Sequence, residues 1–547
     1  MSQPTHSSSS SAIPLGIGVA GLLLAGGFWI WHGDDRTNQI IAMIYVAVPT
    51  LLLLAGWWLL LAGGGWRSRL VVAAGFLAVA GLLAASFRMD GYWGSFVPRF
   101  SPRWSLTAEE RANEFWKSQQ GNPSAKEGET ASAAGVEPAE RDSGRPARLE
   151  IGAGDWPQFR GPGRNGVVPS AQVRRDWNQN PPRLLWRHPV GPAWSSFAVV
   201  ETLAFTQEQR GDEEAVVCYN IETGDQVWVH TDGARFDTVM GGIGPRATPT
   251  LYDSRLYTLG ATGILNCLEP RTGSVIWSRN ILDDAGARPL EWGFAGSPLV
   301  YDDVVVVNAG GRKGKGVAAY NRVTGEPAWA EGKRSAGYAT PVLASIRGDR
   351  QLLVFGNKGI AGHDAGTGRE LWWFEWKNDT SNNCTQPIAL DDGTVFVSTG
   401  YSKGSVLLDI KKVDDEWSAI PTQWKTSSRF KLKFNGAIRQ GSILYGLSEG
   451  ILTCFDLTTG KHRWKRGRYG YGQLLLIDDV LLVTAESGEV ALVEVSTERY
   501  FEIARFQAIE GKTWNHPVLH QGRLLVRNNE EAACYDLRPP SETARID

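Results

Sequence analysis

Eight large or planar side chains recur in this chain just before short apolar runs, and these residue types are suited to contacting a ligand. They are Trp194, Arg246, Trp292, Tyr338, Asn383, Phe434, Tyr471 and Trp514. Charged residues stand beside some of them, since Glu291 precedes Trp292 and Lys512 lies two positions before Trp514. Aromatic rings with a few charges are typical of sites that bind a small ligand or a peptide. The alternative is that the rings only fill space in the interior.

Three other motifs resemble catalytic or metal sites in spacing but not in context. The stretch from Gly161 to Gly166 has the spacing of a dinucleotide-binding loop, yet it follows no strand and opens no helix. Residues 400–404 match a nucleophile turn but join two strand-like runs. His516 and His520 are four apart, and Pro517 excludes the helix that would align them as metal ligands. We therefore predict no catalytic and no metal-binding residue.

A repeated phrase defines the elements that must position these residues. A short apolar run ends in a Thr-Gly turn, where Gly supplies the positive φ of a tight hairpin, and a Trp follows four residues later. The phrase ends at Trp228, Trp277, Trp329, Trp372 and Trp464. Trp186, Trp424 and Phe506 continue the series where Thr-Gly is lost. Eight aromatic anchors spaced by about 40 to 50 residues have the period of four-stranded propeller blades.

Eight inner-strand starts match the eight anchors. They lie at residues 196–199, 247–250, 296–299, 339–342, 385–388, 435–438, 472–475 and 515–518. Only three strands follow the last start, whereas residues 183–187 form a spare strand before the first. That strand would complete the last blade and close the ring, which removes exposed sheet edges. The predicted fold is therefore an all-β, eight-bladed β-propeller.

The loops that enter the inner strands should converge at one mouth of the central channel. We predict a ligand-binding site at this funnel mouth. Its candidate residues are Trp194, Arg246, Glu291, Trp292, Tyr338, Asn383, Tyr471, Lys512 and Trp514. The open alternative is that the aromatic rings plug the channel.

Composition narrows the class of protein. The formal net charge of -2 over 547 residues provides no general attraction to nucleic acid. Four of the five Cys residues, Cys218, Cys267, Cys454 and Cys534, occupy the same place in different repeats, so they should be buried apolar residues rather than disulfides. Cys384 is expected in a loop.

Three apolar runs precede the repeats, at residues 13–31, 40–62 and 70–87. Each is long enough to cross a bilayer core of roughly 30 Å, and Trp residues cluster near the ends. The first connecting loop carries Asp34 and Asp35, whereas the second carries Arg67 and Arg69. The positive-inside rule places the second loop in the cytoplasm. We therefore predict a multi-pass inner-membrane protein with its C-terminal propeller in the periplasm.

The domain organisation follows from these segments. Residues 1–104 form the membrane anchor, and residues 105–154 form a short helix and a disordered linker. The helix begins with a capping box at Thr107 and Glu110 and runs to about Gln120. The linker is rich in Ala, Gly, Ser, Glu and Pro, which cannot form a packed core. The propeller spans residues 155–538, and residues 539–547 form a tail.

The repeats resemble a known family. The Thr-Gly-x-x-x-Trp phrase, the lead-in sequence from Asp155 to Pro162 and the Ala-Cys-Tyr-Asp-like strands are similar to the PQQ-type (pyrroloquinoline quinone) β-propeller repeat family. The resemblance covers about residues 155 to 538. The family includes quinoprotein alcohol dehydrogenases and the non-enzymatic propeller lipoprotein of the outer-membrane β-barrel assembly machinery. The fold is implied strongly and the function weakly, because the repeat residues are structural.

Two functions follow from the resemblance. Quinoprotein dehydrogenases grip the quinone with a ring of adjacent Cys residues, a Ca²⁺ site of Glu, Asn and Asp, and an Asp base, and this sequence has no Cys-Cys pair. The preferred interpretation is a non-catalytic binding or scaffolding module of the cell envelope, without a cofactor. Its partner would be an envelope protein or a small ligand at the funnel. The alternative is an alcohol or sugar dehydrogenase that uses PQQ and calcium. The lipoprotein relative is anchored through an N-terminal Cys, whereas the first Cys here is Cys218.

Overall fold

The structure is a computed structural model that describes residues 12–31, 36–60, 65–120, 148–168, 171–427 and 429–539. The chain divides into two compact units, Met1–Leu106 and Thr107–Asp547. Most of the predicted linker, residues 121–147, and the tail from residue 540 onward lie outside the described residues.

The first unit contains three helices long and apolar enough to cross a membrane. These are α1 (Ala12–Trp31), α2 (Arg36–Leu60) and α3 (Trp66–Ser86), as the hydropathy pattern predicts. At most 6% of the apolar stretch in each helix is buried inside the protein. The side chains of these stretches therefore need an apolar surrounding such as lipid. A hairpin of β1 (Phe87–Tyr92) and β2 (Pro98–Pro102) follows α3. The helices are thus compatible with a membrane anchor.

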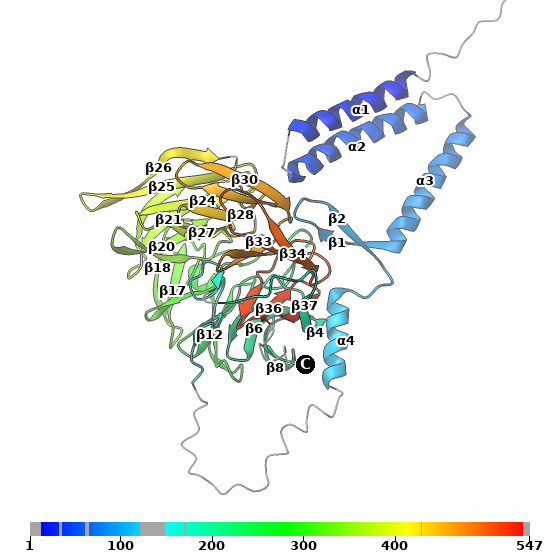
Figure 1. Ribbon diagram of the computed structural model, residues 1–547. Coiled ribbons are helices and arrows are strands. Elements are labelled where there is room, and N and C mark those ends of the chain that lie inside the picture. The colour runs from blue at the N-terminus through cyan, green and yellow to red at the C-terminus, as the bar shows by residue number, and fades with distance from the viewer. Residues whose placement is uncertain are drawn as a thin grey trace, which may run out of the picture. The chain divides into compact units, whose positions relative to one another are not determined.

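The second unit is an eight-bladed β-propeller, which confirms the predicted fold (Figure 1). Each blade is an antiparallel sheet whose strands follow one another from the inner to the outer edge. Blade 1 contains β5 (Ala198–Val200), β6 (Leu203–Arg210), β7 (Glu213–Asn220) and β8 (Gln226–Asp232). Blade 2 contains β11 (Thr250–Tyr252), β12 (Arg255–Leu259), β13 (Ile264–Leu268) and β14 (Val275–Asn280). Blade 3 contains β15 (Leu299–Tyr301), β16 (Val304–Val307), β17 (Val317–Asn321) and β18 (Pro327–Glu331).

The remaining blades repeat this order. Blade 4 contains β19 (Val342–Ile346), β20 (Asp349–Gly356), β21 (Gly359–Asp364) and β22 (Glu370–Glu375). Blade 5 contains β23 (Ile388–Ala389), β24 (Thr394–Thr399), β25 (Gly404–Val413) and β26 (Glu416–Ser427). Blade 6 contains β27 (Ile438–Gln440), β28 (Ile443–Ser448), β29 (Ile451–Asp456) and β30 (Lys461–Arg468). Blade 7 contains β31 (Gln473–Ile477), β32 (Val480–Thr484), β33 (Glu489–Glu494) and β34 (Glu502–Gln507). Shorter elements are β9 (Asp237–Thr238), β10 (Gly242–Ile243) and α5 (Ile281–Ala285).

Blade 8 closes the ring with strands from both ends of the domain. Its β35 (Val518–His520), β36 (Arg523–Arg527) and β37 (Glu531–Asp536) are joined by β4 (Arg183–Pro189). In the register of β37 with β4, Cys534 lies opposite Trp186 and Ala532 opposite His188. Figure 1 shows β4 beside β37 although the two are far apart in the sequence. The predicted closure by residues 183–187 is confirmed.

The eight anchors all lie on outer strands and join neighbouring blades. A Cβ on Gly325, in the Thr-Gly turn of blade 3, would lie 2.6 Å from the ring of Trp277 in blade 2. The indole N–H of Trp277 donates to the Arg322 carbonyl in the same turn at 3.1 Å. The equivalent N–H groups of other anchors also donate to a carbonyl of the next blade, from Trp186 to Ile221, Trp228 to Pro270, Trp424 to Leu457 and Trp464 to Ser496. The repeated phrase therefore encodes the joint between two blades as well as a turn.

Residues 155–168 run across the centre of the ring and contact the inner edge of every blade. Trp156 pairs with Val199 of blade 1, and β3 (Val167–Val168) adds a parallel strand to β31 of blade 7. Pro157 contacts Leu251 of blade 2, and Arg164 contacts Pro298 of blade 3 and Pro341 of blade 4. Arg160 contacts Gln386 of blade 5 and Ala437 of blade 6, and Phe159 contacts His516 of blade 8. We call residues 155–168 the hub. The Gly161–Gly166 stretch lies in it without opening a helix, as the sequence context indicates.

One helix, α4 (Ala108–Gln120), belongs to the propeller unit. Its capping box forms as predicted, since the Glu110 amide donates to the Thr107 hydroxyl at 3.1 Å and the Thr107 amide donates to the Glu110 carboxylate at 2.7 Å. Figure 1 shows α4 beside β4. The helix therefore packs at the junction where the ring closes.

Candidate ligand-binding mouth of the propeller

The structure places the candidate residues in the segments that enter the inner strands, one segment per blade. Trp194 precedes β5, Arg246 precedes β11, Trp292 precedes β15, Tyr338 precedes β19, Asn383 precedes β23, Phe434 precedes β27, Tyr471 precedes β31 and Trp514 precedes β35. Because all inner strands run in the same direction along the channel, these segments meet at one end of it. We call this end the mouth.

A row of three partly exposed rings, tilted against one another, forms one side of the mouth. The ring centroids of Trp194 and Trp514 are 4.8 Å apart, and those of Trp514 and Phe434 are 4.7 Å apart. The ammonium group of Lys512 lies 4.2 Å from the Trp514 ring and 4.8 Å from the Trp194 ring. Lys512 is only 5% exposed, so these cation–π contacts form in a largely water-free setting, where they are strongest. The Trp514 N–H donates to Glu486 at 2.8 Å, which orients the ring.

A second buried lysine supports the next part of the mouth. The ammonium group of Lys433 lies 4.5 Å from the Tyr471 ring and 4.7 Å from the Tyr401 ring. The Tyr471 hydroxyl donates to Glu449 at 2.9 Å. Tyr401 also approaches Phe434, at 6.4 Å between ring centroids. Aromatic side chains and buried charges thus alternate from blade 5 to blade 8.

Blades 1 to 3 meet at Gly241, in the short loop between β9 and β10. Its carbonyl accepts from the Trp194 indole at 2.6 Å and from the Arg246 guanidinium at 2.9 Å. Trp292 packs at the same glycine, since a Cβ there would lie 3.0 Å from its ring. Burial lowers the pKa of Arg246 to about 10, which leaves it cationic at neutral pH. Trp292 in turn donates to the Asn382 side chain at 3.2 Å, which links this group to blade 5.

Three of the candidate residues differ from this pattern. Asn383 is fully buried and donates to the carbonyls of Gly356 and Trp376, so it holds its loop in place and does not line the mouth. Glu291 is exposed beside Trp292, and Tyr338 lies on the same side of the mouth. Burial raises the pKa of Tyr338 above its usual value, so its hydroxyl stays protonated.

The structure also brings to the mouth residues that sequence reasoning did not select. They are Tyr401, Lys433, Glu449, Glu486 and Asn382. Lys433 directly precedes Phe434 in the sequence, as Glu291 directly precedes Trp292. It could therefore have been found by selecting the charged residues beside the recurring aromatic residues. Glu449, Glu486 and Tyr401 follow second strands, and only the folding of each blade brings that end of the strand to the mouth.

Two arginines of the hub lie within the channel. Arg164 donates to the carbonyl of Pro298 at 2.6 Å, and Arg160 donates to the carbonyl of Ala437 at 2.6 Å. Burial lowers the pKa of Arg164 to about 9 and that of Arg160 to about 10. Both guanidinium groups are directed to carbonyl oxygens that begin the inner strands, so they stabilise the ring from within. The hub therefore lies within the channel.

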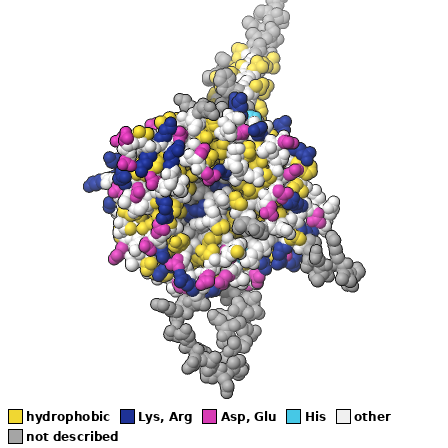
Figure 2. Space-filling view, turned by 60° about the vertical axis from the view of Figure 1, so that its left-hand side comes forward, with side chains coloured by type: hydrophobic (Ala, Val, Ile, Leu, Met, Phe, Trp, Pro, Cys, Tyr) yellow, Lys and Arg dark blue, Asp and Glu magenta, His cyan; other side chains and the backbone are white. Residues whose placement is uncertain are grey.

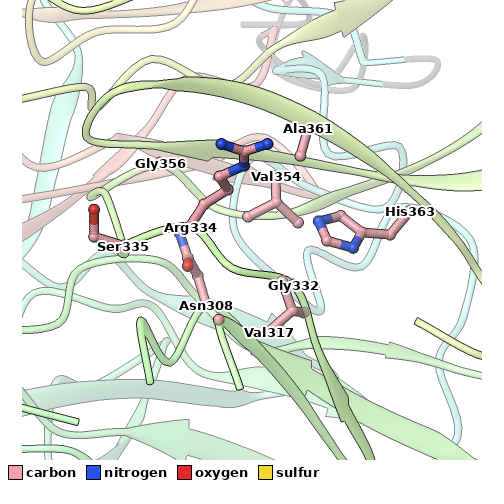
Figure 3. Close-up of a pocket in the computed structure, with 10 residues that line it drawn as sticks. Asn308, Val317, Gly332, Arg334, Ser335, Val354, Gly356, Ala361 and His363 are labelled. Atoms are coloured by element: carbon pink, nitrogen blue, oxygen red, sulfur yellow. The ribbon is translucent and has the colours of Figure 1, made fainter. Parts of the chain in front are cut away.

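A small cavity lies between blades 3 and 4 (Figure 3). Asn308, Arg334 and His363 are among its lining residues, and its volume is about 10 Å³. That space holds about one water molecule. The Asn308 amide nitrogen has no hydrogen-bond partner among the described residues, so a single water would satisfy it. The cavity is too small for a substrate.

One side of the propeller has a mixed distribution of charge. Figure 2 shows this side, on which Lys and Arg alternate with Asp and Glu around the edge, and which is hollowed near its centre. The side drawn in Figure 2 therefore shows no continuous basic stripe of the kind found in nucleic-acid-binding proteins.

The described residues lack the adjacent Cys pair that is typical of a quinoprotein. Within these ranges, no group of three or more His, Cys, Asp or Glu side chains is close enough to hold a metal ion. Cys218, Cys267, Cys454 and Cys534 are buried in four different blades, and no two cysteines are joined. Glu449 and Glu486 lie near the mouth, but their carboxylates accept hydrogen bonds from Tyr471 and Trp514.

Comparison with known proteins identifies the family. The model of the family described as outer membrane protein assembly factor BamB, a PQQ-type repeat family, matches residues 175–294 and 212–466, more than half of the chain. The chain belongs to this family. No curated protein sequence matches it. Membership of the BamB family agrees with the resemblance seen in the repeats, and it shows the propeller class without showing a specific role.

Solved structures share the fold at low sequence identity. Quinohemoprotein alcohol dehydrogenase from Comamonas testosteroni is 12% identical, with a TM-score of 0.53 over 71% of this chain and 82% of that chain. The quinohemoprotein alcohol dehydrogenase ADHIIG from Pseudomonas putida HK5 is 12% identical, with a TM-score of 0.50 over 72% and 82%. BamB from Moraxella catarrhalis is 16% identical, with a TM-score of 0.46 over 66% and 99%. These likenesses concern the fold alone, because the sequence identities are only 12% to 16%.

Proposed function

We propose that this protein is a membrane-anchored binding or scaffolding module of the cell envelope that recognises a partner protein at the mouth of its propeller. The propeller would lie in the periplasm, held at the inner membrane by α1, α2 and α3. The observation that carries this proposal is the continuous set of partly exposed rings, Trp194, Trp514 and Phe434, supported from beneath by a buried lysine.

The chemistry of the mouth favours a protein partner. Partly exposed Trp and Phe side chains supply large, rigid contact area, and such residues dominate the binding energy of protein interfaces. The nearby charges of Arg246 and Glu291 provide groups that can orient a polar backbone. The family of assembly factors to which the chain belongs also supports a role in binding proteins.

Site-specific photo-crosslinking tests the proposed mouth. A photoreactive amino acid at Glu291, which is exposed at the mouth, should yield a defined crosslinked protein in intact cells, and Trp514→Ala should reduce the yield several-fold. The matched control is the same photoreactive residue at Val227, which is 47% exposed on the outer strand of blade 1. The same products from both positions, or no dependence on Trp514, would contradict binding at the mouth.

The proposed topology is tested by reporter fusions. It rests on Arg67 and Arg69 in one loop against Asp34 and Asp35 in the other. A reporter active only in the periplasm should be active after Asp547 and inactive at Ser68. The opposite pattern would place the propeller in the cytoplasm.

The alternative function is a PQQ-dependent alcohol or sugar dehydrogenase. A titration of the purified protein with PQQ and Ca²⁺, followed by absorbance and by thermal unfolding, separates the two functions. We expect no saturable spectral change and no shift in melting temperature. Saturable binding with reduction of the quinone by an alcohol would favour the enzyme.

A further inference from the structure

Helix α4 is docked on the propeller by four side-chain contacts across the junction of blades 8 and 1. The Phe115 ring stacks on His188 of β4 with centroids 4.9 Å apart. The Arg210 guanidinium lies 3.6 Å from the Trp116 ring. Glu109 forms a two-point ion pair with Arg235 at 3.0 and 3.3 Å, and Arg111 pairs with Glu530 at 2.7 Å.

These contacts come from one side of an amphipathic helix. Ala112, in the middle of that side, is fully buried, whereas Glu114 and Lys117 on the other side are exposed. The spacing of three and four residues between the contacting positions is the period of an α-helix. The helix thus binds as a unit, and its affinity depends on few side chains.

The Trp116 contact continues toward the mouth. Arg210 donates to the carboxylate of Glu208 at 3.3 Å, and Glu208 is fully buried. The same carboxylate oxygen accepts from the amide of Gly191 at 3.1 Å. Gly191 begins the short segment that carries Trp194, so a contact path of three steps joins α4 to a residue of the mouth.

The Glu109 contact leads to the mouth along a second path. Its partner Arg235 directly precedes Phe236, whose ring lies 4.5 Å from the Arg246 guanidinium. The Phe236 carbonyl also accepts from the amide of Gly244 at 2.8 Å. One path passes through the buried carboxylate of blade 1 and the other through the loop that follows β8. Gln209 links the two, because its amide donates to the Pro192 carbonyl at 3.0 Å and its side-chain oxygen accepts from the Phe236 amide at 3.2 Å. The two paths end at Trp194 and Arg246, which meet at Gly241.

We propose that α4 sets the geometry of the blade 1 and blade 2 part of the mouth, with Trp116 and Glu109 as positioning residues for Trp194 and Arg246. This inference takes the mouth from the proposed function, but it concerns the order of two loops, which is measurable without a ligand. Because α4 directly follows the anchor unit in the chain, a change at that end of the chain that released α4 would alter the geometry of the mouth. Packed elements with two arrangements, docked and released, are the physical basis of such coupling.

Hydrogen–deuterium exchange of the full-length protein in detergent micelles tests the proposal. In Trp116→Ala, amides of residues 190–197 should exchange at least about tenfold faster than in the wild type. In Glu109→Gln, the faster exchange should appear in residues 235–246. Residues 376–387, which enter blade 5 four blades away, should not change, and Glu114→Ala on the exposed side of α4 should change nothing.

The double variant Glu109→Gln/Trp116→Ala provides the internal check. Fast exchange of residues 108–120 shows that the helix has been released, and both mouth segments should then be fast. A released helix with wild-type exchange in both segments would overturn the proposal, and so would equal acceleration in all eight mouth segments, which is general destabilisation. Persistent protection of α4 in the double variant would also contradict the assigned contacts. A failure of crosslinking at Glu291 leaves all these outcomes unaffected, so the two proposals can fail separately.

Discussion

Individual residues at the mouth differ from the anchor residues in how fully they are buried. Trp277 is 8% exposed between two blades, where its ring is enclosed by the Thr-Gly turn of the next blade. Trp514 is partly exposed and rests on Lys512. A large buried ring stabilises the fold by the apolar area it removes from water, whereas a half-exposed ring retains area for a ligand.

This difference predicts the cost of removing each ring. Trp277→Ala and Trp372→Ala should each lower the free energy of unfolding by about 3 to 5 kcal/mol, as large-to-small core substitutions do. Trp514→Ala should cost clearly less. Denaturant unfolding of the three variants provides the comparison, and equal losses would mean that the ring at position 514 is as structural as the anchors.

Buried Glu214 in blade 1 makes stability depend on pH. Burial raises the pKa of Glu214 from 4.5 to about 7 in the folded protein, although Thr262 and the Ala261 amide donate hydrogen bonds to it. The folded state thus keeps a proton that the unfolded chain loses above about pH 4.5. The stabilisation is complete below that pH and is lost as the pH rises to about 7, by at most about 3 kcal/mol.

The variant Glu214→Gln should remove this dependence. We expect its free energy of unfolding to exceed that of the wild type at pH 8 and to be similar or lower at pH 4.5. Urea unfolding at both pH values measures the difference. A constant difference between the two proteins across this range would show that Glu214 does not titrate there.

At the scale of elements, the joint between blades depends on glycine. Gly325 has φ +74°, and a Cβ on it would lie 2.6 Å from the Trp277 ring. The same close approach joins Gly224 to Trp186, Gly273 to Trp228 and Gly460 to Trp424. Blade 5 lacks the Thr-Gly turn, and there β25 and β26 form a long hairpin (Figure 1). A blade turn and a Trp of the preceding blade are therefore one packing unit.

A pair of glycine substitutions separates backbone strain from the joint. Gly348 has φ +89° in a turn of blade 4 with no atom within 4 Å of the added Cβ, so Gly348→Ala should cost only the left-handed strain of about 1 kcal/mol. Gly325→Ala adds a clash with Trp277 and should cost at least about 2 kcal/mol more. Thermal and denaturant unfolding would measure both. Equal losses would show that the ring of Trp277 moves aside freely.

At the scale of the whole molecule, the ring is held in two ways. The outer strand β4 completes blade 8, and the hub contacts the inner edge of every blade. Strand β4 covers the edge of β37 that would otherwise be free. The hub connects inner strands of different blades that have no other connection across the channel. Leu149, before the hub, is also buried against blade 1, so the folded unit begins before residue 155.

Three truncated proteins distinguish these contributions. A protein beginning at Thr107 should be soluble, monomeric and cooperative in unfolding. One beginning at Ala171 lacks the hub but keeps β4, so it should stay monomeric with a lower melting temperature. One beginning at Ser195 lacks β4 as well, and the open edge of β37 should cause aggregation.

Size-exclusion chromatography would measure the oligomeric state of the three proteins, and calorimetry would measure their melting temperatures. Aggregation of the Ala171 protein to the same extent as the Ser195 protein would assign the protection to the hub instead of the closing strand. A soluble Ser195 protein with normal melting would contradict the role of β4.

The sequence by itself determined the propeller and its closure. Each Thr-Gly turn, apolar run and Trp acts within a few residues, so the eight repeats could be counted and the spare strand before blade 1 recognised. The capping box at Thr107 and Glu110 likewise predicted α4, because a helix start depends on neighbouring residues. The three apolar runs also predicted helices, because the length of an apolar run is a local feature of the sequence.

Only the tertiary structure decided which side chains share a site. Asn383 occupies the expected position in its loop, yet its amide is buried in hydrogen bonds to Gly356 and Trp376. Tyr401 and Glu449 follow the second strands of their blades, and only the folded blade brings these positions to the mouth. The docking of α4 and the path of Arg160 and Arg164 through the channel join residues far apart in the sequence, such as Phe115 with His188 and Arg160 with Ala437. Such contacts depend on the closed ring, and local sequence patterns contain no information about which distant surfaces a ring brings together.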